Sequence, residues 1–249
     1  MDFNIKKPKH ILALFLIGIT FFLIVIYPIW IFFNFSEISF DYLQQFSEPV
    51  KFLIELFSFI FQLIFVIVLL IIFPILWYLL VNNVGFKKSL YAMKIKLKNP
   101  FDSIIWGIIT FILLFGFSMV LGIIIIILGY NNQEVSNIPD LESIFSLPFL
   151  FIIVAFQPIA EEIFFRGFLL QKIKSIVGKE SAIIFTSIFF GLAHLSYGNV
   201  YPAISSMVLG FVLSYIVIKK DNLLPAIIGH SLYNVITIIL YLMAKSIPF

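Results

Sequence analysis

Residues 104–128 read IIWGIITFILLFGFSMVLGIIIIIL, an uninterrupted run without a charged side chain. A helix needs about 20 mostly apolar residues to cross a hydrocarbon core of roughly 30 Å, so this run predicts a transmembrane helix. Working outward from it, six more stretches predict spans. They cover residues 11–33, 52–81, 147–170, 182–195, 202–218 and 223–243, and the fifth span of the resulting seven, 182–195, is short unless it extends into Ser196 and Tyr197.

The overall composition supports this interpretation. Hydrophobic residues make up 62% of the chain and charged residues 12%, whereas globular proteins average about 45–50% and about 25%. We therefore predict an all-α, polytopic bundle of about seven transmembrane helices, or eight if the long stretch with Pro74 is split or a re-entrant segment exists. The first stretch is too long for a signal-peptide core and has no convincing cleavage site after it, so we expect it to be retained.

The loop charges predict the orientation in the membrane. Lysines precede the first stretch and follow the second, fourth and sixth, while acidic residues occupy the alternate loops. This positive-inside pattern predicts a multi-pass cell-membrane protein with a cytoplasmic N-terminus. The net charge of +3 gives no reason to expect a nucleic-acid partner. The acidic loop residues are Glu37, Asp41, Glu48, Glu134, Asp140 and Glu142.

Several polar side chains lie inside the predicted spans of the C-terminal half. An ionisable group in the hydrocarbon costs at least about 2.5–3.5 kcal/mol, so such groups usually face a cavity or one another and carry function. They are Glu161, Glu162 and Arg166 in the fourth span, His194 in the fifth, and His230 and Asn234 in the seventh.

Helical spacing suggests different roles for the two glutamates. Glu162 and Arg166 are four residues apart, so they lie on one face and can pair as a neutralising structural pair. Arg166, the only arginine of the chain, can grip a carboxylate with two hydrogen bonds. Glu161 points about 100° away from Glu162 around the helix, which predicts that it is the free carboxylate.

The remaining side chains complete a group that could activate water. His230 and Asn234 are four residues apart and share a face, and Phe190 lies one turn before His194, where we expect it to pack. A carboxylate can accept a proton from water, an imidazole can orient that water, and His230 with Asn234 can donate to a developing oxyanion.

These residues resemble the three motifs of the CAAX prenyl endopeptidase and bacteriocin-processing family, also called the CPBP or Abi family. The motifs are Glu-Glu-x-x-x-Arg, Phe-x-x-x-His and His-x-x-x-Asn or Asp, and all three occur in order within residues 147–234. The resemblance implies an intramembrane glutamate-type endopeptidase that cleaves a membrane-associated peptide or protein. It implies that Glu161 and His194 activate the water and that His230 and Asn234 stabilise the oxyanion.

The same resemblance divides the chain and raises the question of a metal. We expect three accessory spans in residues 1–146 and four catalytic spans in 147–249, within one integrated membrane domain. Older descriptions treat the family as metalloproteases. Two histidines and a glutamate on three separate helices are compatible both with a metal site and with a metal-free site. The chain has no His-Glu-x-x-His signature, so we favour no cofactor and no metal, with a divalent metal as the alternative.

Other functions fit the sequence less well. The motifs could be kept for stability in a non-enzymatic bacteriocin immunity factor or membrane scaffold, since single histidines in spans often form interhelical hydrogen bonds. A proton-coupled transporter is a poorer interpretation because no paired broken helices are evident. The sequence leaves the substrate and the oligomeric state open.

The proposed group requires one unusual feature of the chain. At about 1.5 Å per residue, Glu161 and His194 lie about 20–25 Å from the connection at Gly178, while His230 lies only about 10 Å beyond Leu223. The three side chains can meet only if the segment 221–225 dips into the membrane or the helices tilt. Backbone buried against protein can do this.

Overall fold

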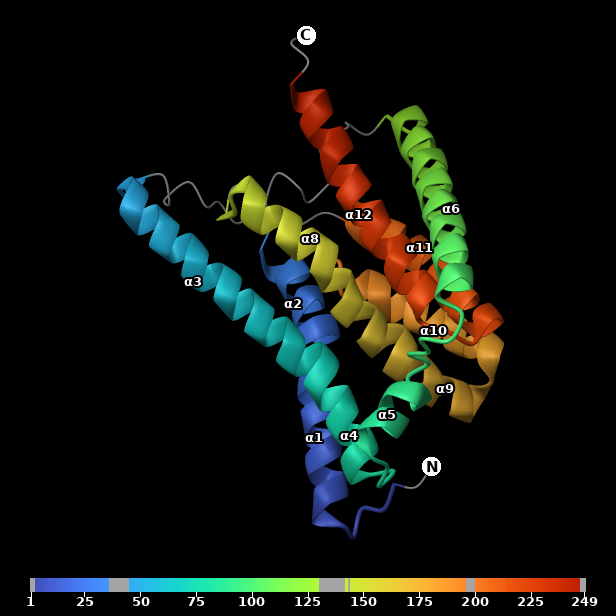
Figure 1. Ribbon diagram of the computed structural model, residues 1–249. Helices are drawn as coiled ribbons and strands as arrows, with labels where there is room; N and C mark the ends of the chain where they lie inside the picture. Colours follow the sequence, from blue (N-terminus) through green and yellow to red (C-terminus); the bar gives the residue numbers. More distant parts are fainter. Residues whose placement is uncertain (1–2, 36–44, 130–141, 143, 196–199, 247–249) are drawn as a thin grey trace.

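The computed structural model describes residues 3–35, 45–129, 142, 144–195 and 200–246, and within these residues it contains helices and no strand (Figure 1). The predicted all-α class is confirmed. Three long rods each contain a π-helical segment, labelled η. The elements are α1 (Pro8–Phe21), η1 (Phe22–Ile26), α2 (Tyr27–Asn34), α3 (Glu48–Val66), η3 (Ile67–Ile72), α4 (Phe73–Leu80), α5 (Phe86–Ala92), α6 (Pro100–Ile127), α8 (Leu147–Glu162), η5 (Ile163–Leu169), α9 (Leu170–Val177), α10 (Lys179–Leu192), α11 (Tyr201–Lys220) and α12 (Leu224–Lys245).

Six of the described helices are long and apolar enough to cross a membrane. The fifth predicted span, residues 182–195, corresponds to α10, which has only 14 residues and is not among the six. Its suggested extension through Ser196 and Tyr197 lies outside the described residues, as do the loop residues Glu37, Asp41, Glu134 and Asp140. The long stretch with Pro74 forms one continuous rod, Glu48–Leu80. The expectation of about seven spans therefore agrees with the structure. The six are Pro8–Asn34, Glu48–Leu80, Pro100–Ile127, Leu147–Val177, Tyr201–Lys220 and Leu224–Lys245.

Proline accounts for the π-helical segment in the second rod. The N–H of Phe73 bonds to the carbonyl of Val68, five residues back, which is the π-helical pattern. Pro74 follows and has no N–H to offer. The carbonyl of Leu69 instead accepts a hydrogen bond from the Thr20 hydroxyl of α1, at 3.3 Å. The irregular backbone is thus satisfied by a neighbouring helix, as hydrocarbon surroundings require.

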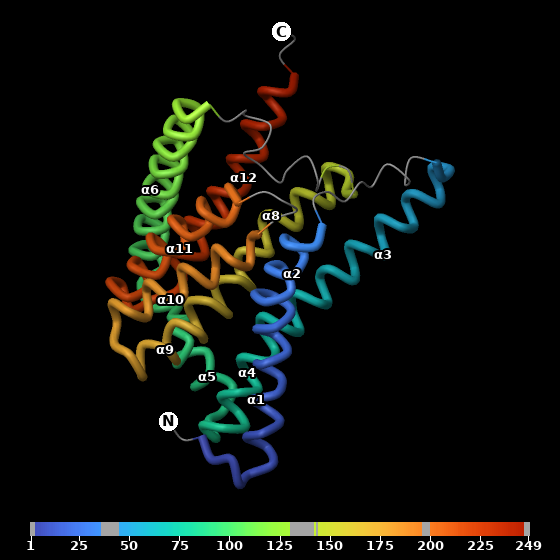
Figure 2. The backbone as a smooth tube through the Cα atoms, turned by 180° about the vertical axis from the view of Figure 1, so that it is seen from behind, coloured from blue at the N-terminus to red at the C-terminus, as the bar shows by residue number. Residues whose placement is uncertain are grey.

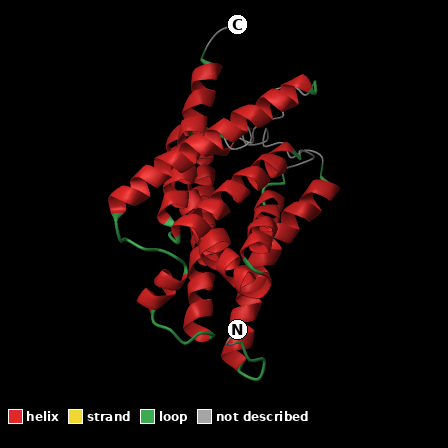
Figure 3. Ribbon diagram, turned by 90° about the vertical axis from the view of Figure 1, so that its right-hand side faces the viewer, coloured by secondary structure: helices red, strands yellow, loops and turns green. Residues whose placement is uncertain are grey.

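The helices are arranged around the α8–η5–α9 rod. The α1–η1–α2 rod and α3 lie on one side of it and α6 on the other, while α12 runs beside α6 (Figures 1 and 2). The start of α1 and the end of α12 lie at opposite ends of the bundle (Figure 3), as an odd number of crossings demands.

Glycines let the C-terminal helices approach closely. A Cβ at Gly107 of α6 would lie 2.5 Å from the Ile228 side chain of α12, and one at Gly229 would lie 2.6 Å from Thr110. Small residues at such crossings are typical of membrane helix packing.

Charged residues gather at the two ends of the bundle. The start of α3, the start of α8 and the end of α12 lie at one end, with α5 and the α9–α10 connection at the other (Figures 1 and 2). Glu48 lies at the first end and the lysines of α5 at the second. At the lysine-rich end, Asp102 pairs with Lys220 at 3.1 Å, and Asp221 pairs with two lysines, Lys94 and Lys96.

The connection between α11 and α12 packs against two distant parts of the chain. Leu223 is fully buried, and its N–H donates to the carbonyl of Lys94 at 2.8 Å. A Cβ on Gly167, in η5, would lie 3.4 Å from the Leu223 side chain and 3.1 Å from the carbonyl of Met93. Leu223 therefore packs against η5, the segment that directly follows the two glutamates. From this start, α12 brings His230 within hydrogen-bond distance of Glu162.

Candidate active site

The candidate site lies where α8 passes into η5. Glu161 and Glu162 are the last two residues of α8, and Arg166 lies in the following π-helical segment. Glu161 is 7% exposed and Glu162 and Arg166 are completely buried. Charges buried to this extent need partners. Helix α8 runs through Pro158 without a break, and the irregular segment begins only at Ile163.

Glu162 binds two partners through one oxygen. Arg166 Nη1 donates to Glu162 Oε1 at 2.7 Å, the i,i+4 pair that helical spacing suggests. His230 Nδ1 of α12 lies 3.0 Å from the same oxygen. Because an ionised carboxylate only accepts, His230 Nδ1 carries the hydrogen of this bond. The sequence did not predict that His230 contacts Glu162, because this contact depends on how α12 packs.

The Arg166 guanidinium is enclosed by two neighbouring helices. Its central carbon lies 4.0 Å from the centre of the Phe190 ring of α10. A Cβ at Gly210 of α11 would lie 3.2 Å from Nη2, so this glycine leaves the room that the guanidinium occupies. A cation over a ring face gains about 2 kcal/mol when desolvated. Gly210 belongs to the site although the sequence marks it only as a glycine inside a span.

Glu161 is held separately from this pair. Gln157 Nε2 donates to Glu161 Oε1 at 2.7 Å, and Gln62 Nε2 of α3 donates to Gln157 Oε1 at 3.3 Å. The other oxygen of Glu161, Oε2, lies 4.0 Å from His230 Nε2. The two glutamates therefore have different surroundings, with Glu162 in the ion pair and Glu161 facing His230 across a short gap.

His194 follows the end of α10, close to the same group. Its Nδ1 lies 2.7 Å from the Phe190 carbonyl, and the centres of the two rings are 4.5 Å apart. The Phe190 ring also lies 5.8 Å from the His230 ring, so it contacts both imidazoles in addition to Arg166. His194 is within electrostatic range of Glu161 and His230, but no direct hydrogen bond joins it to Glu161 among the described residues.

Asn234 is not joined to the group. In the described part of the chain, no hydrogen bond or ion pair connects Asn234 to the carboxylates or imidazoles, although it lies one turn beyond His230 on α12. Its neighbour Tyr233 is 2.7 Å from the Ser118 hydroxyl of α6. No group of three or more His, Asp or Glu side chains in the described ranges is placed to hold a metal ion.

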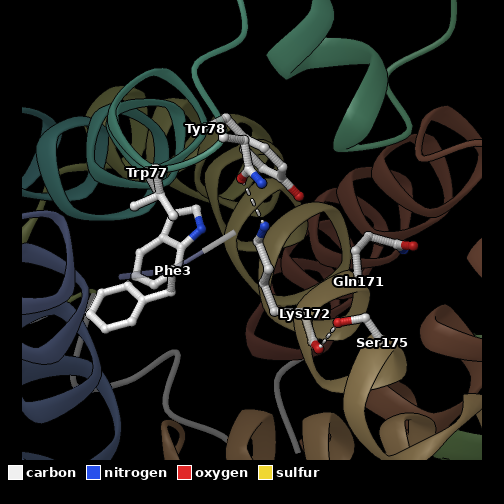
Figure 4. A pocket seen from close by; sticks show the side chains of 8 residues that line it. Phe3, Trp77, Tyr78, Gln171, Lys172 and Ser175 are labelled. Atoms are coloured by element: carbon white, nitrogen blue, oxygen red, sulfur yellow. Dashed lines mark hydrogen bonds between the residues drawn. The ribbon is translucent and has the colours of Figure 1, made fainter. Parts of the chain in front are cut away.

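A separate cavity of about 260 Å³ lies between α4 and α9 (Figure 4). Lys172 Nζ donates to Asn82 Oδ1 at 3.1 Å and lies 4.2 Å from the centre of the Tyr78 ring. None of the motif residues lines this cavity, so it is distinct from the candidate site. Its lining consists of Phe3, Trp77, Tyr78, Val81, Asn82, Gln171, Lys172 and Ser175.

Comparison with known families identifies the region that carries this group. Residues 143–236 match the family model described as type II CAAX prenyl endopeptidase Rce1-like. The resemblance to the CAAX prenyl endopeptidase family is confirmed over this region. All three motifs lie within it.

Similar proteins occur in several bacteria. An uncharacterized protein of Mycoplasma capricolum is 33% identical over 98 residues, which are 39% of this chain and 28% of that protein. The uncharacterized protein YyaK of Bacillus subtilis is 27% identical over 160 residues, covering 57% of this chain and 53% of that protein. The UPF0177 protein YxdF of Lactococcus lactis is 25% identical over 125 residues, covering 47% of this chain and 68% of that protein.

The chain thus spans about half or less of the length of the first two relatives. No solved structure matches the chain.

Proposed function

We propose that the protein is an intramembrane endopeptidase of the glutamate type, acting on a membrane-associated peptide or protein. The match to a family of prenyl endopeptidases supports a membrane protease. One observation supports the specific site most. Glu161 is buried, unpaired with Arg166, and directs one oxygen toward His230 across 4.0 Å.

The gap between Glu161 and His230 suits a water molecule. At 4.0 Å the two atoms are too far apart for a direct hydrogen bond. A water about 2.8 Å from each could bridge them. His194 donates through Nδ1 to the Phe190 carbonyl, which leaves Nε2 as the acceptor, and we assign to it the second hydrogen of that water.

The proposed reaction moves one proton through Glu161. The Glu161 carboxylate takes a proton from the water. At the same time the water oxygen bonds to the carbonyl carbon of the peptide, which gives a tetrahedral oxyanion. When the C–N bond breaks, the proton passes from Glu161 to the leaving amine nitrogen. Hydrolysis is then complete, with one water consumed and two new chain ends formed.

His230 is the proposed donor to the oxyanion, together with Asn234. Its Nδ1 is bonded to Glu162, so Nε2 is the ring nitrogen that faces the space beside Glu161. A donor fixed in this way stabilises developing charge without reorganising. Glu162 and Arg166 would act as a structural pair that holds this ring in place.

A non-enzymatic role is the second candidate. The enclosed contacts of Arg166 with Glu162, Phe190 and Gly210 are those of a structural centre, which an immunity factor or scaffold would also need. Such a role would depend on the Glu162 and Arg166 pair, whereas Glu161 would be dispensable.

The two candidates are separated by one substitution. The purified full chain in detergent would be incubated with a library of membrane-associated peptides, some carrying a C-terminal prenyl group, and products would be measured by mass spectrometry. We expect Glu161→Gln, which keeps the size and loses the base, to reduce cleavage at least a hundredfold. Its elution on size exclusion should match that of the wild type. Cleavage at the wild-type rate by this variant would rule out Glu161 as the base.

A further inference from the structure

Two glutamines outside the three motifs contact the site. Gln62 lies on α3 and Gln157 on α8, in helices that are otherwise largely apolar. An amide in apolar surroundings costs free energy unless it is hydrogen-bonded. Both side chains therefore need polar partners, and their partners lead to Glu161.

The hydrogen bonds form a directed chain. Gln62 Nε2 donates to Gln157 Oε1 at 3.3 Å, and Gln157 Nε2 donates to Glu161 Oε1 at 2.7 Å. Because the carboxylate only accepts, the NH₂ group of Gln157 must face it, and the amide oxygen then faces Gln62. A reversed Gln157 would place its oxygen against the carboxylate.

This chain determines which oxygen of Glu161 is available. Oε1 is bound by Gln157, whereas Oε2 lies 4.0 Å from His230 Nε2. Without the Gln157 bond, the carboxylate could rotate away from His230. The bond therefore orients the proposed base before substrate arrives. Such prior orientation lowers the activation barrier of the reaction.

We propose that Gln157 is a positioning residue for Glu161 and that Gln62 acts through Gln157, so that α3 supports the site from outside the matched region 143–236. This inference rests on the proposed function. It assigns α3 more than the accessory role that the sequence suggests for residues 1–146.

The test compares kinetic constants of variants. On a peptide that the wild type cleaves, Gln157→Met should lower kcat by about ten- to a hundredfold, the usual loss for a hydrogen bond to a charged group. KM should stay within about twofold, because a residue that only orients the base changes kcat rather than substrate binding. Gln62→Ala should lower kcat by a smaller factor, and Gln45→Ala, at an exposed glutamine, is the matched control.

A double variant distinguishes positioning from general stability. If Gln62 acts through Gln157, adding Gln62→Ala to Gln157→Met should lower kcat no further. Equal effects of Gln62→Ala in both backgrounds, or a Gln157→Met enzyme with wild-type kcat, would overturn the inference. The proposed function would remain intact in either case if Glu161→Gln is still inactive.

A second readout does not depend on turnover. The infrared bands of the Glu161 carboxylate can be isolated as the difference between the wild-type and Glu161→Gln spectra. Loss of a donor on Oε1 should shift the carboxylate stretch in the Gln157→Met protein. An unchanged band would contradict the contact whether or not a substrate has been found.

Discussion

At the scale of single residues, two adjacent glutamates have different surroundings. Glu162 shares one oxygen between Arg166 and His230, while Glu161 is bound by Gln157 and faces His230 with its other oxygen. The spacing of the motif was enough to suggest the ion pair, because residues four positions apart lie on the same face of a helix. It could not suggest the contacts of Glu162 with His230 or of Gln157 with Gln62, since these join helices whose relative rotation is set by packing.

The buried ion pair predicts a large loss of stability when one partner is removed. Arg166→Leu leaves Glu162 charged and buried, which typically costs about 3–5 kcal/mol. Arg166→Lys should also destabilise, because lysine lacks the planar group that lies over Phe190. The apparent melting temperature in detergent, measured by size exclusion after heating, would report both losses.

A compensating variant provides the control for that prediction. Glu162→Gln combined with Arg166→Met removes both charges and should recover part of the lost melting temperature. If Arg166→Leu alone melts like the wild type, the pair does not stabilise the fold.

At the scale of elements, the helices position the site through irregular features. The apolar runs predicted the rods, but not their π-helical segments, since these depend on hydrogen bonds such as that from Thr20 to Leu69. Nor could a run of hydrophobic residues show that Leu223 lies against Gly167. The sequence required either a dip of the segment 221–225 or tilted helices, and it could not show that the N–H of Leu223 bonds to the carbonyl of Lys94.

The crossing of α10 with α11 predicts a specific sensitivity. A Cβ at Gly191 would lie 2.6 Å from the Ala203 carbonyl and 2.9 Å from Met207 Cβ. A backbone carbonyl cannot swing aside, so Gly191→Ala should push the helices apart and cost about 1–3 kcal/mol. His194 lies three residues further on and should be displaced, lowering both the melting temperature and cleavage.

Another glycine offers a matched comparison for Gly191→Ala. Gly116 in α6 has open space where a Cβ would be. Gly116→Ala should therefore leave cleavage unchanged and stabilise the helix by up to about 1 kcal/mol. Equal behaviour of the two alanine variants would show that the α10–α11 contact is less tight than described.

At the scale of the whole molecule, we propose the cytoplasmic N-terminus that the loop charges predict. The chain contains no cysteine, so a single introduced cysteine is the one site that a maleimide can label in this chain. Cysteines replacing Lys88 and Lys179 should react with an impermeant maleimide only in inside-out vesicles. Cysteines replacing Glu48 and Ser246 should react on intact cells, because these residues are exposed toward the other end of the bundle. Labelling of all four from one side would refute the topology.

The backbone hydrogen bond between Leu223 and Lys94 limits which fragments and chimeras of this protein can fold correctly. The first turn of α12 depends on a carbonyl supplied by the segment before α6, more than a hundred residues earlier in the chain. A fragment that begins after α6 would lack that acceptor and the face on which α12 packs. Grafting only the motif-bearing helices onto a foreign membrane anchor should therefore misplace His230. Successful chimeras will need to carry over residues from Met93 onward.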